Sequence, residues 1–576
     1  MFKLNHYVIC QLICFLFILF GTVVYAQTIN IGGLKDVFKA KPIVFNGGAS
    51  ANNSFYAGNS NRDPYNYTLQ GNINANLFGQ LHLPFTFSLS NVGSTYSYPS
   101  PPNRLDLHPT YKWISGHIGN VTMSFSPYTL NGHPFSGVGL DLTPSGPWKV
   151  SVMTGRLQKA VAYDLKNPKV LPAYHRMGYG SKIVYEKLGY KLGLSAFYAG
   201  DERMSLVGMP DSLALSPQQN LAVCYTAQFR LGHGFDVQME YGNSAITLDN
   251  SDTTTVRSTH NYLKSLMGER GQTAFYHAIK LGVSYTFMKT TLGLGYERVD
   301  PGYRTLGAYY FNNDFENMTI NVSRALLKDK MLLSGNIGLQ YDNLDGKKSA
   351  TTHRMVGSMN ISCTPTERWQ FNGNYSSFRT HMNIQSPFQK INQLPSFSNV
   401  DTLNFVQISQ SAQVNSMLTT RKDECRNHQL GVNIAFQDAS DQRVGGVCKK
   451  GNGSQIYNLA TSYNMLYLKK SIQVNLSYTI SHNRTDFNHS LTHGPSAQAS
   501  TKLLNKNMTT GLLTSYNTST QRGIQQNSTF NVRLSVAYAV FKAHNLSLAL
   551  MNQYRSTRNK IQTSDLMGTL GYNWSF

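Results

Sequence analysis

The chain ends with the stretch Leu566-Met567-Gly568-Thr569-Leu570-Gly571-Tyr572-Asn573-Trp574-Ser575-Phe576, and this stretch decides the fold. Every second residue from Leu566 to Phe576 belongs to a set that is mostly apolar and ends in three aromatic residues, while the residues between them are mainly small or polar. In a β-strand, successive side chains point to opposite faces. The pattern therefore predicts a strand with one face against lipid and the other against water.

This ending resembles the C-terminal signal of bacterial outer-membrane β-barrel proteins, in which a terminal aromatic residue, usually Phe, follows alternating apolar residues. The resemblance implies an outer-membrane location, contact with outer-membrane lipid, and delivery by the barrel-assembly machinery through the C-terminal strand. A second stretch, Tyr310-Phe311-Asn312-Asn313-Asp314, resembles envelope barrels of Bacteroidota, which implies the same fold and no particular function.

The N-terminal end predicts export. Lys3 precedes an apolar run from Val8 to Val24, and Val24-Tyr25-Ala26 has the small-x-small form of a cleavage site. We expect residues 1–26 to be a signal peptide and 27–40 a short periplasmic leader; an uncleaved anchor helix is the alternative. The leader is too short for the plug domain of TonB-dependent receptors, so the sequence disfavours that family.

Composition excludes helical membrane spans in the rest of the chain. After the signal there is no second apolar run near the roughly 20 residues that a membrane helix requires. Only 14% of the residues are charged, and the chain holds 34 Tyr and 29 Phe. This composition is too aromatic for disorder and fits strands that are half polar and half apolar.

Alternation continues along the chain as one hairpin after another, as in Tyr65 to Leu77 followed by Leu81 to Leu89. We expect short turns near 78–80, 144–146, 188–189, 232–234, 289–290, 328–330, 365–368, 469–470, 504–506 and 542–544, and longer polar loops such as 245–272, 380–400 and 481–493. Short turns face the periplasm in outer-membrane barrels. The sequence predicts an all-β fold, a single antiparallel barrel over 41–576 with about 26 strands (range 22–28).

The formal charge of +22 suggests an anion-selective pore only if the excess lies in the lumen. The strand assignment places these charged residues toward the lumen: Lys112, Lys149, Lys182, Lys191, Arg230, Asp236, Glu240, Lys280 and Arg533. Asp141, Glu297, Asp342 and Asp565 also face inward in this assignment. The luminal wall is therefore nearly balanced, which weakens the case for anion selectivity.

The positive excess falls partly on the short turns, where it forms a predicted basic rim: Lys187, Lys289, Lys328, Lys330, Lys469, Lys470, Lys506 and Lys542. Lipid phosphates at the inner leaflet are the first interpretation of this rim, and an acidic periplasmic protein is the second. Nucleic acid is excluded as a partner, because the basic residues are dispersed and the chain is exported.

Aromatic residues provide an independent check, because amphipathic rings concentrate where lipid meets water. The expected membrane-interface aromatics are Trp113, Trp148, Trp369, Trp574 and Phe576, each beside a predicted periplasmic turn or the chain end. Four cysteines remain after the signal, and we expect Cys425 and Cys448 to lie at opposite barrel ends and not to pair. No spacing indicates a catalytic, cofactor or metal site, so we expect none.

Three classes of function stay open. The leading hypothesis is a channel for passive or facilitated passage of small polar solutes, narrowed by loops such as 245–272 folding inward. A barrel of this width without a filled lumen would leak. The alternative is therefore a scaffold or translocation component that binds a periplasmic or lumen-filling protein. An outer-membrane enzyme is the third class and has no candidate residues.

Overall fold

The computed structural model describes residues 42–576 except 59–62, 92–102, 164–171, 207–214, 252–253, 255–261, 268–270, 348–352, 378–379, 384–404, 441–452, 486–487 and 559–561. The predicted signal peptide and leader, and Cys448, lie outside the described residues. The strands are β1 Ile43–Ala57, β2 Tyr65–Leu77, β3 Leu81–Ser90, β4 Arg104–Leu107, β5 Thr110–Tyr111, β6 Ile114–Ser124, β7 Asn131–Leu142, β8 Trp148–Gln158, β9 Arg176–Lys187, β10 Tyr190–Asp201, β11 Gln219–Leu231, β12 Phe235–Thr247, β13 Thr273–Phe287, β14 Thr290–Val299, β15 Phe315–Leu326, β16 Met331–Asp342, β17 His353–Thr366, β18 Trp369–Ser376, β19 Thr380–Asn383, β20 Phe405–Lys422, β21 Arg426–Ser440, β22 Gly453–Tyr467, β23 Ile472–Thr485, β24 His489–Leu503, β25 Met508–Gln521, β26 Ile524–Phe541, β27 His544–Thr557 and β28 Gln562–Ser575.

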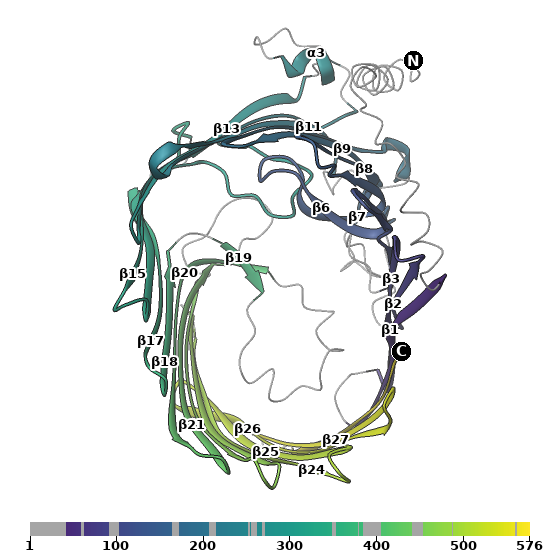
Figure 1. Ribbon diagram of the computed structural model, residues 1–576, viewed down its shortest axis with the longest axis vertical. Helices are drawn as coiled ribbons and strands as arrows, with labels where there is room; N and C mark the ends of the chain where they lie inside the picture. The colour runs from purple at the N-terminus through teal and green to yellow at the C-terminus, as the bar shows by residue number, and fades with distance from the viewer. Residues whose placement is uncertain are drawn as a thin grey trace.

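These strands form one closed antiparallel barrel with 26 strand positions, which confirms the predicted fold class and strand number. β4 and β5 together fill one position between β3 and β6, and β18 and β19 share another beside β20. Figure 1 shows the strands as a ring viewed down the barrel axis, with the C-terminus next to β1. Closure matters because every backbone donor and acceptor in hydrocarbon needs a partner within the protein.

The C-terminal stretch closes the ring. β28 pairs with β1 from Gly48 opposite Ser575 to Ala57 opposite Leu566. Two backbone hydrogen bonds extend this pairing, from Gly47 N to Phe576 O at 2.9 Å and from Phe576 N to Gly47 O at 3.0 Å. The strand that the sequence marked as the last one therefore forms the seam.

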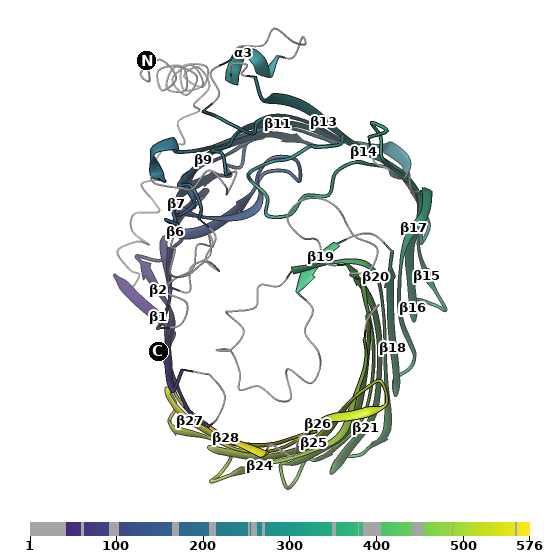
Figure 2. The ribbon, with the colours of Figure 1, turned by 180° about the vertical axis from the view of Figure 1, so that it is seen from behind.

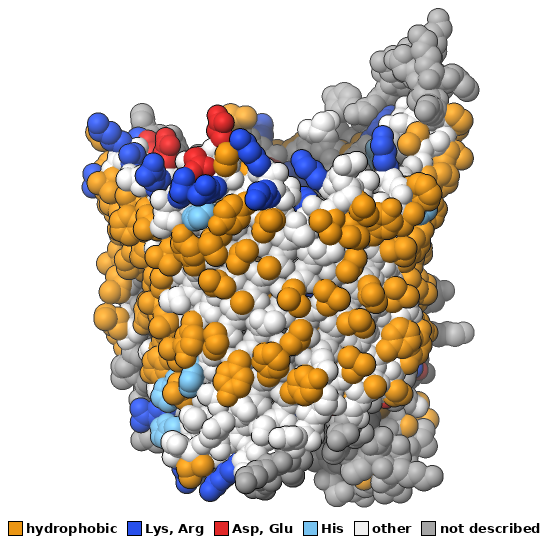
Figure 3. All heavy atoms as spheres, turned by 90° about the horizontal axis from the view of Figure 1, so that it is seen from below, with side chains coloured by type: hydrophobic (Ala, Val, Ile, Leu, Met, Phe, Trp, Pro, Cys, Tyr) orange, Lys and Arg blue, Asp and Glu red, His pale blue; other side chains and the backbone are white. Residues whose placement is uncertain are grey.

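The apolar set of each strand faces outward. Large exposed apolar side chains recur at every second position, as Leu566, Leu570 and Tyr572 do on β28. Figure 3 shows hydrophobic side chains as a broad band across the face of the wall that it displays, bounded by two rims. The opposite parity therefore lines the lumen, and the pleat assigns each strand residue to one face.

The short turns lie where the sequence predicts them, between β2 and β3, between β7 and β8, and at each later hairpin of the same end. We name this the periplasmic end and the opposite one the outer end. The predicted loop 481–493 is wrong, because β23 runs to Thr485 and β24 begins at His489. His489 and His493 consequently lie on a strand, where His493 Nδ1 contacts the Tyr478 hydroxyl at 2.8 Å.

The predicted inward loop 245–272 is also wrong in the part that the structure describes. Ala245 to Thr247 belong to β12, and the short helix α3 (Leu263–Met267) follows. Leu263 is buried against Val223 and Ala245, which have outward parity, so α3 packs on the outside of the wall (Figure 1). Among the described residues, no helix is long and apolar enough to cross a membrane.

Candidate functional site: two loops folded into the barrel

Two loops of the outer end fold into the barrel: residues 125–130, between β6 and β7, and residues 300–314, between β14 and β15. Figures 1 and 2 show both inside the ring of strands. Phe125 and Leu130 from the first loop and Leu306 from the second are buried together with the luminal side chains of Phe135 and Phe197. The barrel therefore contains a hydrophobic core on the luminal side of part of its wall.

The two loops are joined to each other by buried hydrogen bonds. The Tyr303 hydroxyl donates to the Tyr128 carbonyl oxygen at 2.8 Å, and the Thr305 hydroxyl donates to the Thr129 carbonyl oxygen at 2.7 Å. Burial raises the pKa of the Tyr303 phenol well above its ordinary value, so this hydroxyl stays a neutral donor. Both tyrosine rings cover Cys224 on the luminal face of β11. We call loops 125–130 and 300–314 together the inner latch.

The inner latch is fastened to the wall through Asn220 of β11. The Asn220 side chain accepts from the Leu306 backbone N–H at 3.1 Å and donates to the Ser244 hydroxyl at 2.8 Å. The Ser244 hydroxyl in turn donates to the Arg304 carbonyl oxygen at 2.6 Å. Asn220 and Ser244 are fully buried, so the backbone of the second loop is satisfied by side chains of the wall.

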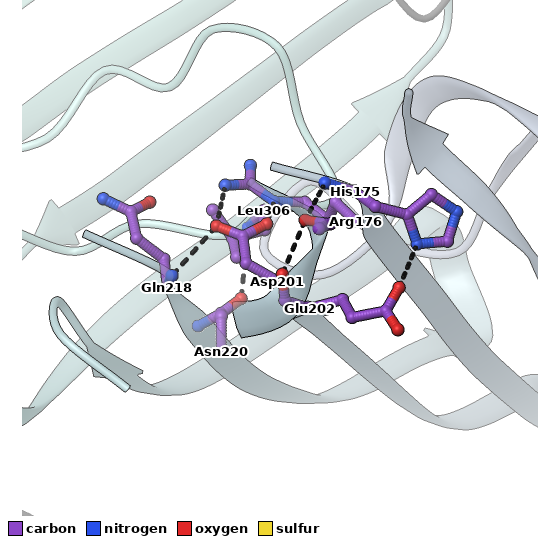
Figure 4. Close-up of polar contacts among 8 residues, drawn as sticks. His175, Arg176, Asp201, Glu202, Gln218, Asn220 and Leu306 are labelled. Carbon is purple, nitrogen blue, oxygen red and sulfur yellow. Dashed lines mark hydrogen bonds and ion pairs between the residues drawn. The ribbon is translucent and has the colours of Figure 1, made fainter. Parts of the chain in front are cut away.

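An ion pair stands beside this contact at the outer end of β9 and β10. Figure 4 shows the Arg176 guanidinium against the Asp201 carboxylate, with Asn220 and Leu306 close by. Arg176 Nε lies 2.7 Å from Asp201 Oδ1 and Nη2 lies 2.9 Å from Oδ2, while the Gln218 backbone N–H donates to Asp201 at 2.9 Å. The Asp201 side chain is only 2% exposed, so the pair is fixed in place.

The predicted luminal charges on β8 to β13 have luminal parity and lie on the strands beneath or beside the inner latch. Lys182 Nζ donates to the Phe125 carbonyl oxygen at 2.7 Å, and the Tyr128 hydroxyl donates to Glu297 at 3.0 Å. With Asp141 of β7, Glu297 of β14 and Glu186, which the sequence analysis did not single out, luminal cations and anions on β7 to β14 are equal in number besides the Arg176–Asp201 pair: Lys149, Lys182, Lys191, Arg230 and Lys280 against Asp141, Glu186, Asp236, Glu240 and Glu297.

Register brings several of these opposite charges side by side. Lys149 lies 2.6 Å from Glu186, which Lys191 approaches at 3.8 Å, and Arg230 lies 3.5 Å from Asp236. Lys280 is directly opposite Glu240 on one side and Glu297 on the other. Lys112 does not belong to this group, because it lies in the turn between β5 and β6 with a φ of +52°.

The luminal wall of β15 to β27 has a different chemistry, dominated by amide and hydroxyl side chains. Such groups bond across neighbouring strands: Gln340 to Asn317 at 2.7 Å, Ser362 to Asn372 at 2.9 Å and Gln553 to Asn531 at 2.9 Å. Arg533 of β26 also has luminal parity, opposite Leu513 and Met551. Most of the hydrogen-bonding groups on this part of the wall carry no charge.

The basic rim lies at the periplasmic end. Lys187 is the last residue of β9, and the other seven predicted rim lysines lie in short turns: Lys289, Lys328, Lys330, Lys469, Lys470, Lys506 and Lys542. Figure 3 shows Lys and Arg gathered at one rim of the wall, with a few carboxylates among them. Carboxylates in the turns of this end include Asp329, 2.5 Å from Lys289, and Asp423, whose pKa is lowered by the hydrogen bond from Arg421.

The predicted interface aromatics are all exposed and all lie at the periplasmic end. Trp113 immediately precedes β6, Trp148 is the first residue of β8, and Trp369 is the first residue of β18. Trp574 and Phe576 lie at the end of the chain. Trp369 donates from its indole N–H to the Ser416 hydroxyl at 3.0 Å, and the Trp574 ring stacks 6.3 Å from His544. Amphipathic rings at this level fit an aromatic girdle.

Cys224, Cys363 and Cys425 are free thiols in the structure. Cys425 lies in the periplasmic turn between β20 and β21. The expectation that Cys448 lies at the opposite end and does not pair with it stays a prediction, because Cys448 is outside the described residues. Within the described residues, no group of three His, Cys, Asp or Glu side chains is arranged to hold a metal ion.

Neither a family model nor a curated protein matches the chain. Solved structures resemble it weakly. The FrpB iron transporter from Neisseria meningitidis (F5-1 variant) is 10% identical over 94% of this chain and 82% of its own, with a TM-score of 0.38. The copper transporter OprC is 9% identical (93% and 81% covered, TM-score 0.39). OccAB3 from Acinetobacter baumannii is 10% identical (67% and 98% covered, TM-score 0.27).

Likenesses at this level carry no argument about function. The location rests instead on the molecule itself, because a closed barrel with an apolar exterior and a polar interior is the form in which strands cross an outer membrane. The chain is a bacterial outer-membrane β-barrel. Its apolar band contacts outer-membrane lipid.

Proposed function

We propose that the barrel is a channel for small polar solutes, and that the inner latch narrows its lumen. The observation that supports this most is the contrast between the two faces of the wall, since the luminal face of β15 to β27 is built from hydrogen-bonding side chains such as Asn317, Asn372 and Asn531. A hydrated wall of this kind suits the passage of polar solutes. The inner latch supplies the inward-folded loops that a wide barrel needs to restrict leakage.

Balanced charge defines the selectivity that we propose. Because luminal cations and anions on β7 to β14 are equal in number, we expect weak discrimination between potassium and chloride despite the formal charge of +22.

Single-channel recording of the purified barrel in a planar bilayer tests the proposal. Discrete, steady current steps with a reversal potential near zero in a potassium chloride gradient are the expected result. Complete electrical silence of a folded barrel contradicts a channel.

The second candidate is a scaffold that binds an acidic periplasmic protein at the basic rim. The gathering of Lys and Arg at the periplasmic end favours it, since a surface of one sign attracts a partner of the other. Electrical silence together with co-purification of a periplasmic protein is the result that supports this candidate. Delivery by the barrel-assembly machinery through β28 is compatible with both.

A further inference from the structure

The luminal wall contains a hollow of about 600 Å³ at the seam where the barrel closes. Its lining comes from β1, β2, β3, β4, β27 and β28 and is rich in groups that form hydrogen bonds: Ser50, Gln70, Asn72, Thr86, Ser88, Arg104, Asp106, Asn545 and Asn573. These side chains have luminal parity, as the register of β1 with β2 and β28 requires. The volume lies within the range of small-molecule sites, about 300 to 1,000 Å³.

One polar atom in the hollow has an unmet hydrogen bond. Asp106 Oδ2 accepts from the Thr86 hydroxyl at 2.8 Å, but Asp106 Oδ1 is buried without a partner. A buried carboxylate oxygen without a donor is costly, and the Asp106 side chain must turn for a ligand hydroxyl in the hollow to supply the missing donor. Arg104 lies two residues before Asp106 on the same face of β4, so a donor fork stands next to the acceptor.

The remaining lining is neutral on every side. Gln70 and Asn72 come from β2, while Asn545 and Asn573 face each other across β27 and β28. Amides donate and accept at once, as a hydroxyl does, so they suit a ligand that presents hydroxyl groups all around its edge. The Arg104 and Asp106 charges cancel, which leaves no net attraction for an anion or a cation.

We propose that this hollow is a binding site for a neutral polyhydroxylated solute, such as a mono- or disaccharide, within the lumen. The inference rests on the proposed channel function and adds a solute class to it. A zwitterion would engage Arg104 and Asp106 but would leave the surrounding amides and hydroxyls without partners. A polyol satisfies both sets.

Block of the single-channel current by sucrose tests the site in the full-length barrel, with glycylglycine as the zwitterionic probe. We expect sucrose to reduce the current in a saturable way and glycylglycine to have no saturable effect. Saturable block by glycylglycine without block by sucrose overturns the proposal in favour of a zwitterion site. If the wild-type barrel conducts no current, the channel function fails, and titration calorimetry of sucrose into the detergent-solubilised barrel then tests the site by itself.

Two substitutions locate the site, Asp106→Ala and Asn573→Leu. Each removes a hydrogen-bonding group from the hollow, so each should raise the half-blocking sucrose concentration about tenfold. Asn372→Leu is the matched control, because it removes an amide from the luminal face of β18, outside the hollow, and should leave the sucrose block unchanged. Heat-dependent mobility on SDS gels verifies that each variant is folded. Equal sucrose block in wild type and both hollow variants overturns the proposal.

Discussion

The Tyr303 hydroxyl donates a hydrogen bond to the Tyr128 carbonyl oxygen at 2.8 Å, although 175 residues separate them in the chain. Both side chains are buried, and their rings meet edge to face with centroids 6.0 Å apart. The contact joins the β6–β7 loop to the β14–β15 loop across the luminal faces of the strands between them. The conformation of the inner latch therefore depends on the contact between its two loops inside the barrel.

Tyr303→Phe should loosen the inner latch. The substitution leaves the buried Tyr128 carbonyl oxygen without this donor, at a cost of about 1 to 3 kcal/mol. Cys224 is a built-in reporter, because both tyrosine rings cover it. We expect faster labelling of Cys224 by a water-soluble maleimide, measured after Cys363, Cys425 and Cys448 are replaced by Ser. Tyr538→Phe, on the outward face of β26, is the control and should label like the parent. Equal labelling rates for all three proteins contradict the role of the Tyr303 contact.

Gly47→Ala should impair closure of the barrel. Gly47 has a φ of +154°, and a Cβ there would lie 2.1 Å from the Asn72 carbonyl oxygen. Gly47 also exchanges two backbone hydrogen bonds with Phe576, so a shift of β1 breaks the seam. We expect a smaller fraction of protein that resists SDS without heating. Gly232→Ala in a periplasmic turn is the control, since a Cβ there meets nothing within 4 Å. Normal SDS resistance of the Gly47 variant would falsify this account of the seam.

The fold follows from local patterns, and the inner latch does not. Side-chain alternation and turn residues repeat within each hairpin, so strands such as those ending at Leu77 and starting at Leu81 are readable from neighbours alone. The prediction of a loop at 481–493 was wrong because polar residues such as Ser481 and Asn483 also suit the luminal face of a strand. Polarity does not distinguish a hydrated strand from a loop.

The sequence contains one signal that could have predicted the inner latch. Phe135, Leu157 and Phe197 are large apolar residues at positions where alternation gives the lumen. An apolar side chain facing water is unfavourable, so such residues predict that something covers them. Which segment covers them depends on contacts such as Leu306 with Asn220, which join distant parts of the chain and have no local pattern.

Asp201→Ala should destabilise the outer ends of β9 and β10. Asp201 is buried, and its loss leaves the Arg176 guanidinium without its ion-pair partner and the Gln218 N–H without its acceptor. Breaking a buried pair in this way costs about 3 to 5 kcal/mol. We expect faster proteolysis within the loop that follows β10, measured on the barrel in vesicles. Glu202→Ala is the control, because Glu202 is 65% exposed in its contact with His175 and such pairs contribute little. Similar cleavage rates for the two variants would show that the Arg176 pair is not needed there.

Lys280→Glu should make the channel cation-selective. Lys280 stands between Glu240 and Glu297 on neighbouring strands, so its reversal places three carboxylates side by side in the lumen. A luminal field of one sign favours ions of the other sign. The reversal potential in a potassium chloride gradient should move toward the potassium value, and less so at high salt because of screening. An unchanged reversal potential means that the current does not pass this wall.

Lys469→Glu combined with Lys470→Glu tests the basic rim and separates it from the lumen. Both residues lie in the periplasmic turn between β22 and β23, outside the luminal wall, so conductance and ion selectivity should match the wild type. Attraction to an anionic surface, worth about 1 kcal/mol per lysine, becomes repulsion. Binding of the detergent-solubilised barrel to anionic vesicles should therefore fall, and any acidic protein that co-purifies should be lost. Lys506→Gln is the comparison variant: it removes one positive charge from the rim without reversing it, so it should give an intermediate loss of vesicle binding. Wild-type vesicle binding by the double variant would contradict a lipid-binding rim, and altered conductance would place these lysines on the path of the current.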